Sequence, residues 1–337
     1  MKKNKLYIFI AILISVSFFI TAAICNQCGL PVETKISEKE PVEEDIGETI
    51  GKETIVEEIV YKIAFGSEGS IFSCMPDGSD IERVYTAGFF IGNPCWNTDH
   101  TKIVFELYVS YANFSDEGSE PEIFIYDLTS GDVNRLTNRY GLDRQPSFSP
   151  DGKTVVFASS VGGDDVGTFN DEIFSVNIDG NNLIQLTDSP ESDMEPCISP
   201  DGDTIVFTRY IDHKGELYIM DVDGSNIRRL TNNDAEDVYA TFSPDGKYIA
   251  FVSDRSGDCD IWVMSADGSG DAKNLTNSPG RDLLPDYSPD GSMIVFESNR
   301  NEEDEYVFDI FVMTSEGENQ TSITPNLKGT SQCDPSW

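Results

Sequence analysis

Pro146-Ser147-Phe148-Ser149-Pro150-Asp151-Gly152, followed by Val155-Val156-Phe157, is the stretch that decides the fold of this chain. Its Ser-Pro-Asp-Gly segment predicts a tight turn, because proline presets φ at the second turn position while Asp and Gly suit the later ones. The apolar triplet after the turn consists of strand-forming residues and ends in Phe. The stretch therefore predicts two antiparallel strands joined by a short turn.

The same pattern returns along the chain, so we treat an internal repeat as the main feature of the sequence. Ser-Pro-Asp-Gly begins at Ser149, Ser199, Ser243 and Ser288, with a degenerate copy at 97–100. A strand ending in Phe occurs at Phe65, Phe105, Phe157, Phe207, Phe251 and Phe296. An aliphatic–aromatic pair then opens a third strand, a turn that is usually Asp-Gly follows, and a fourth strand ends near a Leu-Thr pair. Six repeats of four antiparallel strands predict an all-β chain folded as a six-bladed β-propeller.

The end of the chain is expected to close this ring. Asp334–Trp337 matches the segments that open the other repeats, such as Pro94-Cys95-Trp96, whereas the strand at Lys62–Phe65 has no such segment before it. We therefore expect residues 331–337 to supply the innermost strand of blade one. Closure of this kind removes the exposed edges that an open row of blades would leave.

The residues before the repeats differ in composition and predict two further regions. Lys2, Lys3 and Lys5 precede the uncharged run Leu6–Ile24, so residues 1–25 are expected to be a signal peptide or a membrane anchor. Residues 26–58 are rich in Glu and predict an acidic disordered linker, and residues 59–337 form the propeller. The lysines place the rest of the chain outside the cytoplasm, in a periplasm or at a cell surface. Lipidation of Cys25 is not favoured, because Ile24 stands where a bacterial lipobox requires a small residue.

Composition narrows the classes of function. The 337 residues carry a formal net charge of −37, which disfavours nucleic acid and favours basic or cation-bearing partners. The two histidines, His100 and His213, are too few for a His-based triad or a multi-histidine metal site, and we expect both to be solvated loop residues. We find no hydrolase elbow, His-Glu-x-x-His or phosphate-binding loop, so we expect neither an enzyme, nor a metal, nor a cofactor. The seven cysteines leave disulfides and buried free thiols as open alternatives.

The repeats resemble those of the TolB-like propeller family, which run Pro-x-aromatic-Ser-Pro-Asp-Gly, then x-Ile-x-Phe, Asp-Gly and Leu-Thr. The resemblance covers residues 59–337 and implies a propeller whose first strand in each blade is innermost. The family includes binding proteins, peptidase-associated propellers and some lyases. TolB itself carries an additional N-terminal α/β domain, and here an acidic spacer is expected in that place.

The ring should have two unlike faces. The short Ser-Pro-Asp-Gly and Asp-Gly turns lie on one face, which we call the turn face, and the more variable connections lie on the opposite loop face. In blade two the loop from Glu106 to Pro121 contains Tyr108, Tyr111 and Phe114, which suit sugar stacking or a protein hot spot if exposed, and local packing if not. Oxygen-rich loops at 159–170 and 301–305 suggest Ca²⁺, although we favour solvated charge.

A second regularity on the loop face concerns charged residues. An Asp stands three residues before the first-strand Pro or Ala at Asp143, Asp193, Asp237 and Asp282, and nearby strand ends supply Arg209, Arg255 and Arg300. We interpret these as architectural, through loop capping or Asp–Arg pairs, rather than as an acidic recruiting ring. Their less regular neighbours are expected to line the funnel and bind a ligand: Arg144, Glu195, Tyr239 and Asp334.

These observations predict a non-catalytic, exported module that binds a protein of the cell envelope or surface through its loop face. The alternative hypothesis is a carbohydrate-binding or polysaccharide-lyase-like propeller, in which the same face takes a glycan. We expect the propeller to be monomeric and to meet the membrane only through its N-terminal segment.

Overall fold

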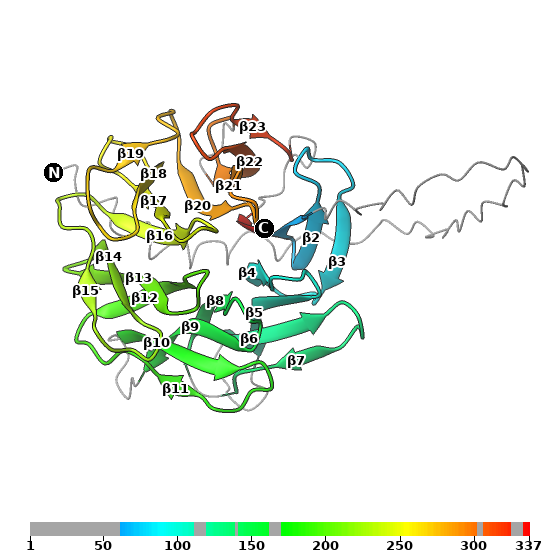
Figure 1. The fold of residues 1–337 in the computed structure, drawn as a ribbon. Coiled ribbons are helices and arrows are strands. Elements are labelled where there is room, and N and C mark those ends of the chain that lie inside the picture. Colours follow the sequence, from blue (N-terminus) through cyan, green and yellow to red (C-terminus); the bar gives the residue numbers. More distant parts are fainter. Residues whose placement is uncertain (1–60, 111–118, 139–140, 162–169, 302–305, 325–332) are drawn as a thin grey trace, which may run out of the picture. The chain divides into compact units, whose positions relative to one another are not determined.

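A computed structural model describes residues 61–110, 119–138, 141–161, 170–301, 306–324 and 333–337. They all belong to the unit that runs from Val60 to Trp337. The described residues form six sheets of four antiparallel strands arranged in a ring (Figure 1), which confirms the predicted all-β six-bladed propeller. None of them belongs to a helix long and apolar enough to cross a membrane. The predicted signal or anchor and the acidic linker lie outside the described residues.

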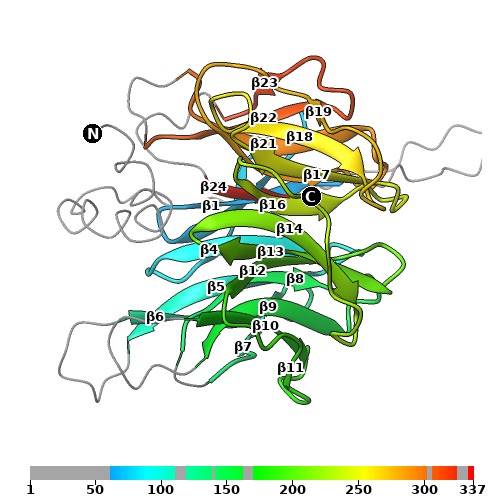
Figure 2. The same cartoon turned by 90° about the vertical axis from the view of Figure 1, so that its left-hand side faces the viewer.

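Each sheet runs outward from the ring axis, and neighbouring sheets lie side by side around it (Figures 1 and 2). The innermost strands are β24 (Cys333–Ser336), β4 (Ile91–Trp96), β8 (Asp143–Phe148), β12 (Ser192–Ile198), β16 (Asp237–Phe242) and β20 (Asp282–Tyr287). The second strands are β1 (Ile63–Ser67), β5 (Lys102–Ser110), β9 (Thr154–Val161), β13 (Thr204–Ile211), β17 (Tyr248–Ser253) and β21 (Met293–Ser298). The third strands are β2 (Ser70–Cys74), β6 (Ser119–Asp127), β10 (Asn170–Asn177), β14 (Lys214–Asp221), β18 (Asp260–Ser265) and β22 (Asp309–Thr314). The outer strands are β3 (Glu82–Thr86), β7 (Val133–Arg135), β11 (Ile184–Gln185), β15 (Arg228–Arg229), β19 (Lys273–Asn274) and β23 (Thr321–Ser322).

Blade one is built from both ends of the described chain. Strand β24 pairs antiparallel with β1, with Ser336 opposite Ala64. Trp337 is buried in a core cluster with Ile63 and Phe65. The predicted closure of the ring by the C-terminal strand is therefore confirmed.

The core repeats from blade to blade because the same residue types occupy the same strand positions. The six second-strand Phe residues are all fully buried: Phe65, Phe105, Phe157, Phe207, Phe251 and Phe296. Each stands opposite the aromatic residue of the third strand, as in the pair Phe157 and Phe174, whose ring centroids are 5.9 Å apart. Aromatic pairs of this kind contribute more than their buried area alone.

The two sequence signatures have local physical causes. In the Ser-Pro-Asp-Gly turn of blade three, Ser149 Oγ donates to Asp151 Oδ1 at 2.8 Å and accepts the Thr154 N–H, while Gly152 takes a φ of 66°. In the Leu-Thr signature, Thr187 Oγ1 accepts the Ile173 N–H at 2.9 Å and donates to the buried carboxylate of Glu172 at 2.6 Å. The threonine therefore ties the outer end of a blade to its third strand.

Candidate functional site

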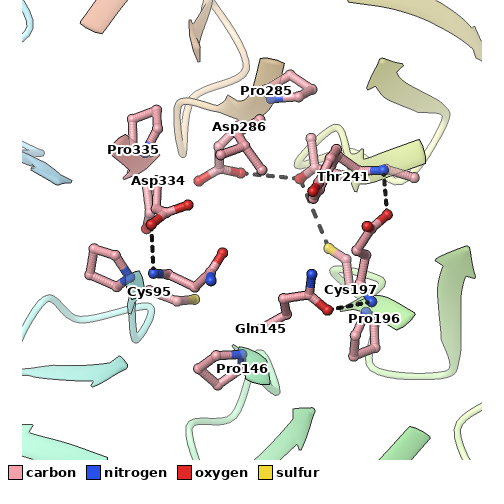
Figure 3. Close-up of a pocket in the computed structure, with 17 residues that line it drawn as sticks. Cys95, Gln145, Pro146, Pro196, Cys197, Thr241, Pro285, Asp286, Asp334 and Pro335 are labelled. Atoms are coloured by element: carbon pink, nitrogen blue, oxygen red, sulfur yellow. Dashed lines mark hydrogen bonds between the residues drawn. The ribbon is translucent and has the colours of Figure 1, made fainter. Parts of the chain in front are cut away.

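The innermost strands surround a cavity of about 150 Å³ on the ring axis. All six blades contribute to its lining, and Figure 3 shows side chains from the surrounding strands gathered about a common centre. We call this cavity the channel pocket.

Each innermost strand has the same backbone irregularity at the channel pocket. One non-glycine residue per strand has a positive φ, between 46° and 59°, and these six residues are Asn93, Gln145, Glu195, Tyr239, Leu284 and Asp334. The pairing register with the second strand shifts at these residues or beside them. Bulges of this kind redirect a side chain, and a positive φ is uncommon in residues other than glycine. We call these six the bulge residues.

The bulge residues join neighbouring blades through side-chain to backbone hydrogen bonds. The Asn93 N–H donates to Asp334 Oδ2 at 3.0 Å, the Glu195 N–H donates to Gln145 Oε1 at 3.2 Å, and the Tyr239 N–H donates to Glu195 Oε2 at 2.9 Å. Each bond satisfies an amide that the bulge releases from the strand ladder. The lining of the channel pocket is thus held in place from one blade to the next.

A second layer of lining residues contains a carboxyl group and two thiols. Asp286 accepts the Trp337 N–H at 2.9 Å and the Thr241 hydroxyl at 3.1 Å, and burial raises its pKa to about 6. Burial also raises the pKa of Cys95 to about 12 and that of Cys197 to about 11, and both thiols are free. A thiol protonated at neutral pH is a poor nucleophile and a poor metal ligand.

The charged residues that line the channel pocket are Glu195, Asp286 and Asp334, and no lysine or arginine is found in the described lining. Two more carboxyl groups, Glu106 on β5 and Glu297 on β21, are buried behind it. The pKa of Glu106 is raised to about 7 and that of Glu297 to about 8. Burial is the main cause of both shifts, and the nearby charge of Asp334 is the second. The charged side chains in the described lining of the pocket are therefore all carboxylic acids.

Three of the four residues predicted to line the funnel do so: Glu195, Tyr239 and Asp334. The expectation for Arg144 is wrong, because its side chain is buried and donates to Asp171 Oδ1 at 2.8 Å instead of lining the pocket. Arg144 is adjacent to the bulge residue Gln145, and alternation along a strand turns such neighbours to opposite sides.

The expectation that Tyr108 is a loop aromatic is also wrong. Tyr108 lies within β5, is buried, and packs edge-on against Phe90 with the ring centroids 5.1 Å apart. Strands β5 and β6 extend further than the predicted loop boundaries allowed, reaching Ser110 and starting at Ser119. Tyr111 and Phe114 lie outside the described residues, as do 162–169 and 302–305, where most of the proposed Ca²⁺ loops fall.

The regular loop-face charges form ion pairs in three blades. Asp193 pairs with Arg209 at 2.6 Å, and the other pairs are Asp237 with Arg255 at 2.7 Å and Asp282 with Arg300 at 2.6 Å. All three aspartate side chains are fully buried. Asp143 is also fully buried and accepts the Ser159 hydroxyl. These contacts are those expected of architectural residues.

The histidines do not behave alike. His100 is half-buried and stacks on Trp96 with the ring centroids 5.0 Å apart, so the expectation of a solvated residue is wrong for it, whereas His213 is exposed in a turn. Within the described ranges no group of three or more His, Cys, Asp or Glu side chains is arranged to hold a metal ion.

Sequence reasoning missed Glu106, Asp286 and Glu297. A signal for two of them was present, since Glu follows the second-strand Phe only in blades two and six, at Phe105-Glu106 and Phe296-Glu297. In the other blades Gly, Ala, Thr or Val follows this Phe. A charged residue at a buried repeat position departs from the pattern and is therefore informative.

Comparison with known proteins agrees with this fold. A model of the TolB beta propeller domain matches residues 74–215 and 209–273, more than half of the chain. The Tol-Pal system protein TolB of Francisella tularensis subsp. mediasiatica is 35% identical over 72 residues, which are 21% of this chain and only 15% of that relative.

Two solved structures show the same architecture. TolB from Acinetobacter baumannii is 24% identical with a TM-score of 0.65, covering 82% of this chain and 66% of that one. A putative TolB from Agrobacterium tumefaciens is 22% identical with a TM-score of 0.62, covering 78% of this chain and 87% of that one. At these identities the likeness concerns the fold.

Proposed function

Because the chain belongs to the TolB beta propeller family, we propose that it is a non-catalytic module that binds a protein partner of the cell envelope at the loop-face end of the channel pocket. The positively charged and apolar start of the sequence supports export, with the propeller outside the cytoplasm. The names of the Tol-Pal relatives support a place in an envelope assembly.

The observation that carries this proposal is the contrast between two equivalent positions of the repeat. The second-strand core position is Phe in all six blades, whereas the bulge position carries six different residues. Packing explains the uniform position, since the six blades bury the same surface. Packing does not demand variety at the channel pocket, but recognition of a ligand without six-fold symmetry does.

The strained backbone of the bulge residues is a second support. A positive φ at Leu284 or Tyr239 disfavours folding and persists because the surrounding sheet determines it. Such backbone states cluster at binding sites, where they fix side-chain direction before a ligand arrives. The proposal therefore places recognition on preorganised side chains.

Retention of partners from an envelope extract on the immobilised protein tests the proposal. We expect a specific partner, identified by mass spectrometry, to be retained by the wild type and lost with Tyr239→Ala. Tyr248→Ala is the matched control, because Tyr248 is exposed beside a turn on the opposite face. Leu284→Ala gives a second test of the lining should Tyr239→Ala disturb folding, which the urea midpoint reports.

If both lining variants keep every specific partner, the proposed surface is wrong. A glycan array with a reducing-end assay on the same proteins addresses the carbohydrate alternative, to which the buried Tyr108 lends no support. Glycan binding or turnover that depends on Tyr239 would replace the protein partner by a sugar.

A further inference from the structure

Four of the five carboxyl groups in and behind the channel pocket belong to blade one, which the C-terminal strand closes, and to its two neighbours, whereas Glu195 lines the pocket from blade four. Asp334 is the bulge residue of blade one, and Glu297 and Glu106 belong to blades six and two, its two neighbours. Glu297 accepts the backbone N–H of Asp334, and Glu106 Oε2 accepts the N–H of Gln145 at 3.3 Å. Each glutamate also interacts electrostatically with Asp334, so carboxyl groups from three consecutive blades lie near one another, with Asp334 lining the pocket and the two glutamates buried behind it.

Hydrogen bonds do not offset the cost of burying the two glutamate carboxyl groups. Glu297 is only 6% exposed, and within the described part of the chain its Oε2 atom has no hydrogen-bond partner. Glu106 is 4% exposed, and its carboxyl group fills the space beside Gly92, where a Cβ atom would come within 2.4 Å of Oε1. A buried carboxylate with an unpaired oxygen is unfavourable unless it takes up a proton or meets a cation.

The other charged and titratable groups around the three carboxyls do not supply that cation. Arg144 lowers the pKa of Glu106 but is ion-paired with Asp171, and Arg281 lowers the pKa of Glu297 while lying over the Phe308 ring at 5.7 Å. Burial raises the pKa of Tyr108 and that of Tyr239 well above the usual value for a phenol, so both side chains are neutral. The pKa values of Glu106 and Glu297 stay raised despite the two arginines.

We propose that this side of the channel pocket receives one cationic group of the partner, a lysine or arginine side chain, against Asp334, and that its arrival releases a proton from the carboxyl groups behind it. The proposal rests on the proposed function and adds the chemical class of the ligand. An organic cation fits better than a metal ion, because no described group of three ligating side chains can hold one. A cation in the pocket lies next to the half-buried carboxylate of Asp334 and acts on the two buried ones through the low-dielectric interior.

The proton balance follows from the environment. Near pH 7 the Glu297 carboxyl is largely protonated and that of Glu106 partly so, because burial has raised both pKa values. A positive charge beside Asp334 stabilises the ionised carboxylates and lowers their pKa. Each ionisation sends a proton to solvent, so affinity for a cation should rise with pH between about 6 and 8.

Calorimetry with a defined probe tests this inference. The probe is a tetralysine peptide blocked at both ends, and its neutral counterpart carries four Nε-acetyl-lysines. Titration of the full chain at pH 7 in phosphate and in Tris, whose ionisation enthalpies differ, gives the number of protons exchanged. We expect tetralysine to bind with release of about one proton and the acetylated peptide not to bind.

Three variants of the full chain locate the effect. Asp334→Asn should weaken tetralysine binding roughly tenfold, and its amide oxygen can still accept the Asn93 N–H. Glu297→Gln should reduce proton release while leaving the fold intact by urea denaturation. Asp179→Asn removes one exposed charge from the turn face and should change neither quantity.

Equal weakening by Asp179→Asn and Asp334→Asn would overturn the proposal in favour of the diffuse field of a chain with net charge −37. Binding without proton release would show that the buried carboxyls are not coupled to the cation. Neither outcome depends on an envelope partner, so a negative calorimetric result leaves partner retention standing, and lost retention leaves the calorimetric result standing.

Discussion

Carboxyl groups on the turn face and carboxyl groups around the channel pocket have pKa values shifted in opposite directions. On the turn face, aspartates such as Asp151 and Asp245 are exposed, and hydrogen bonds from Lys153 and Lys247 lead the effects that lower their pKa to about 2. Around the channel pocket, burial raises the pKa of Glu297 to about 8. The net charge of the chain therefore combines carboxylates that are always ionised with carboxyls that titrate near neutrality, and only the second kind can respond to a ligand at physiological pH.

Removing residues 331–337 should have the largest effect on stability, because the deletion takes one innermost strand from the channel and leaves the turn face intact. Loss of the β24 ladder and of the buried Trp337 should lower the free energy of unfolding by at least about 3 kcal/mol. Urea denaturation measures the change, and Trp337→Phe, which keeps the strand, should lose less. An unchanged midpoint in the truncated protein would contradict closure by this strand.

The ion pairs of the two faces offer a smaller but sharper test. Arg300→Met leaves the fully buried Asp282 without its guanidinium partner and should lower the free energy of unfolding by about 3 kcal/mol. Lys247→Met breaks the exposed pair with Asp245 and should leave the urea midpoint unchanged. Equal effects from the two substitutions would mean that the loop-face pairs are not the structural ties we describe.

The pH dependence of stability should show the smallest effect. Glu297 and Glu106 have raised pKa values in the folded state, so the folded protein binds more protons than the unfolded chain between about pH 4.5 and 8. Their contribution to stability is present below the unfolded pKa and is lost as pH rises through about 7 to 8. Glu297→Gln should therefore be more stable than the wild type at pH 8, by on the order of 1 kcal/mol, and equally stable at pH 5.

Urea midpoints at the two pH values measure this difference. Glu316→Gln, which removes an exposed charge from the turn face, is the control and should show no pH-dependent difference. A Glu297→Gln effect of the same size at pH 5 and pH 8 would mean that Glu297 does not titrate in this range.

The fold could be predicted because each blade repeats a local code. Interactions within about forty residues determine the turn residues, the buried Phe and the terminal Leu-Thr pair of each blade. Because the pattern occurs six times, an error in interpreting one copy does not change the predicted fold. The missing first strand of blade one was readable for the same reason, since Asp334–Trp337 carries the signature of a strand that has no partner nearby in the sequence.

The site was less predictable, because it depends on contacts between blades. Arg144 and Gln145 are adjacent in sequence, yet one is buried against Asp171 and the other lines the channel pocket. The bulge that separates them leaves no mark in residue type, because six different side chains adopt it. Glu106 acquires its raised pKa from burial and from Asp334, 228 positions away in the chain, which local patterns do not report.

The repeated bulge makes the side chains that line the channel exchangeable. Because one backbone conformation holds Asn93, Leu284 and Asp334 alike, the scaffold already accepts neutral polar, aliphatic and acidic side chains at equivalent points. The six bulge positions can therefore be regarded as sites for substitution on a fixed backbone, where one side chain can be changed without altering the hydrophobic core around it. Exchanging bulge residues between blades would rotate the pattern of charge around the ring axis while keeping its composition. Such exchanges would allow the choice of partner to be engineered.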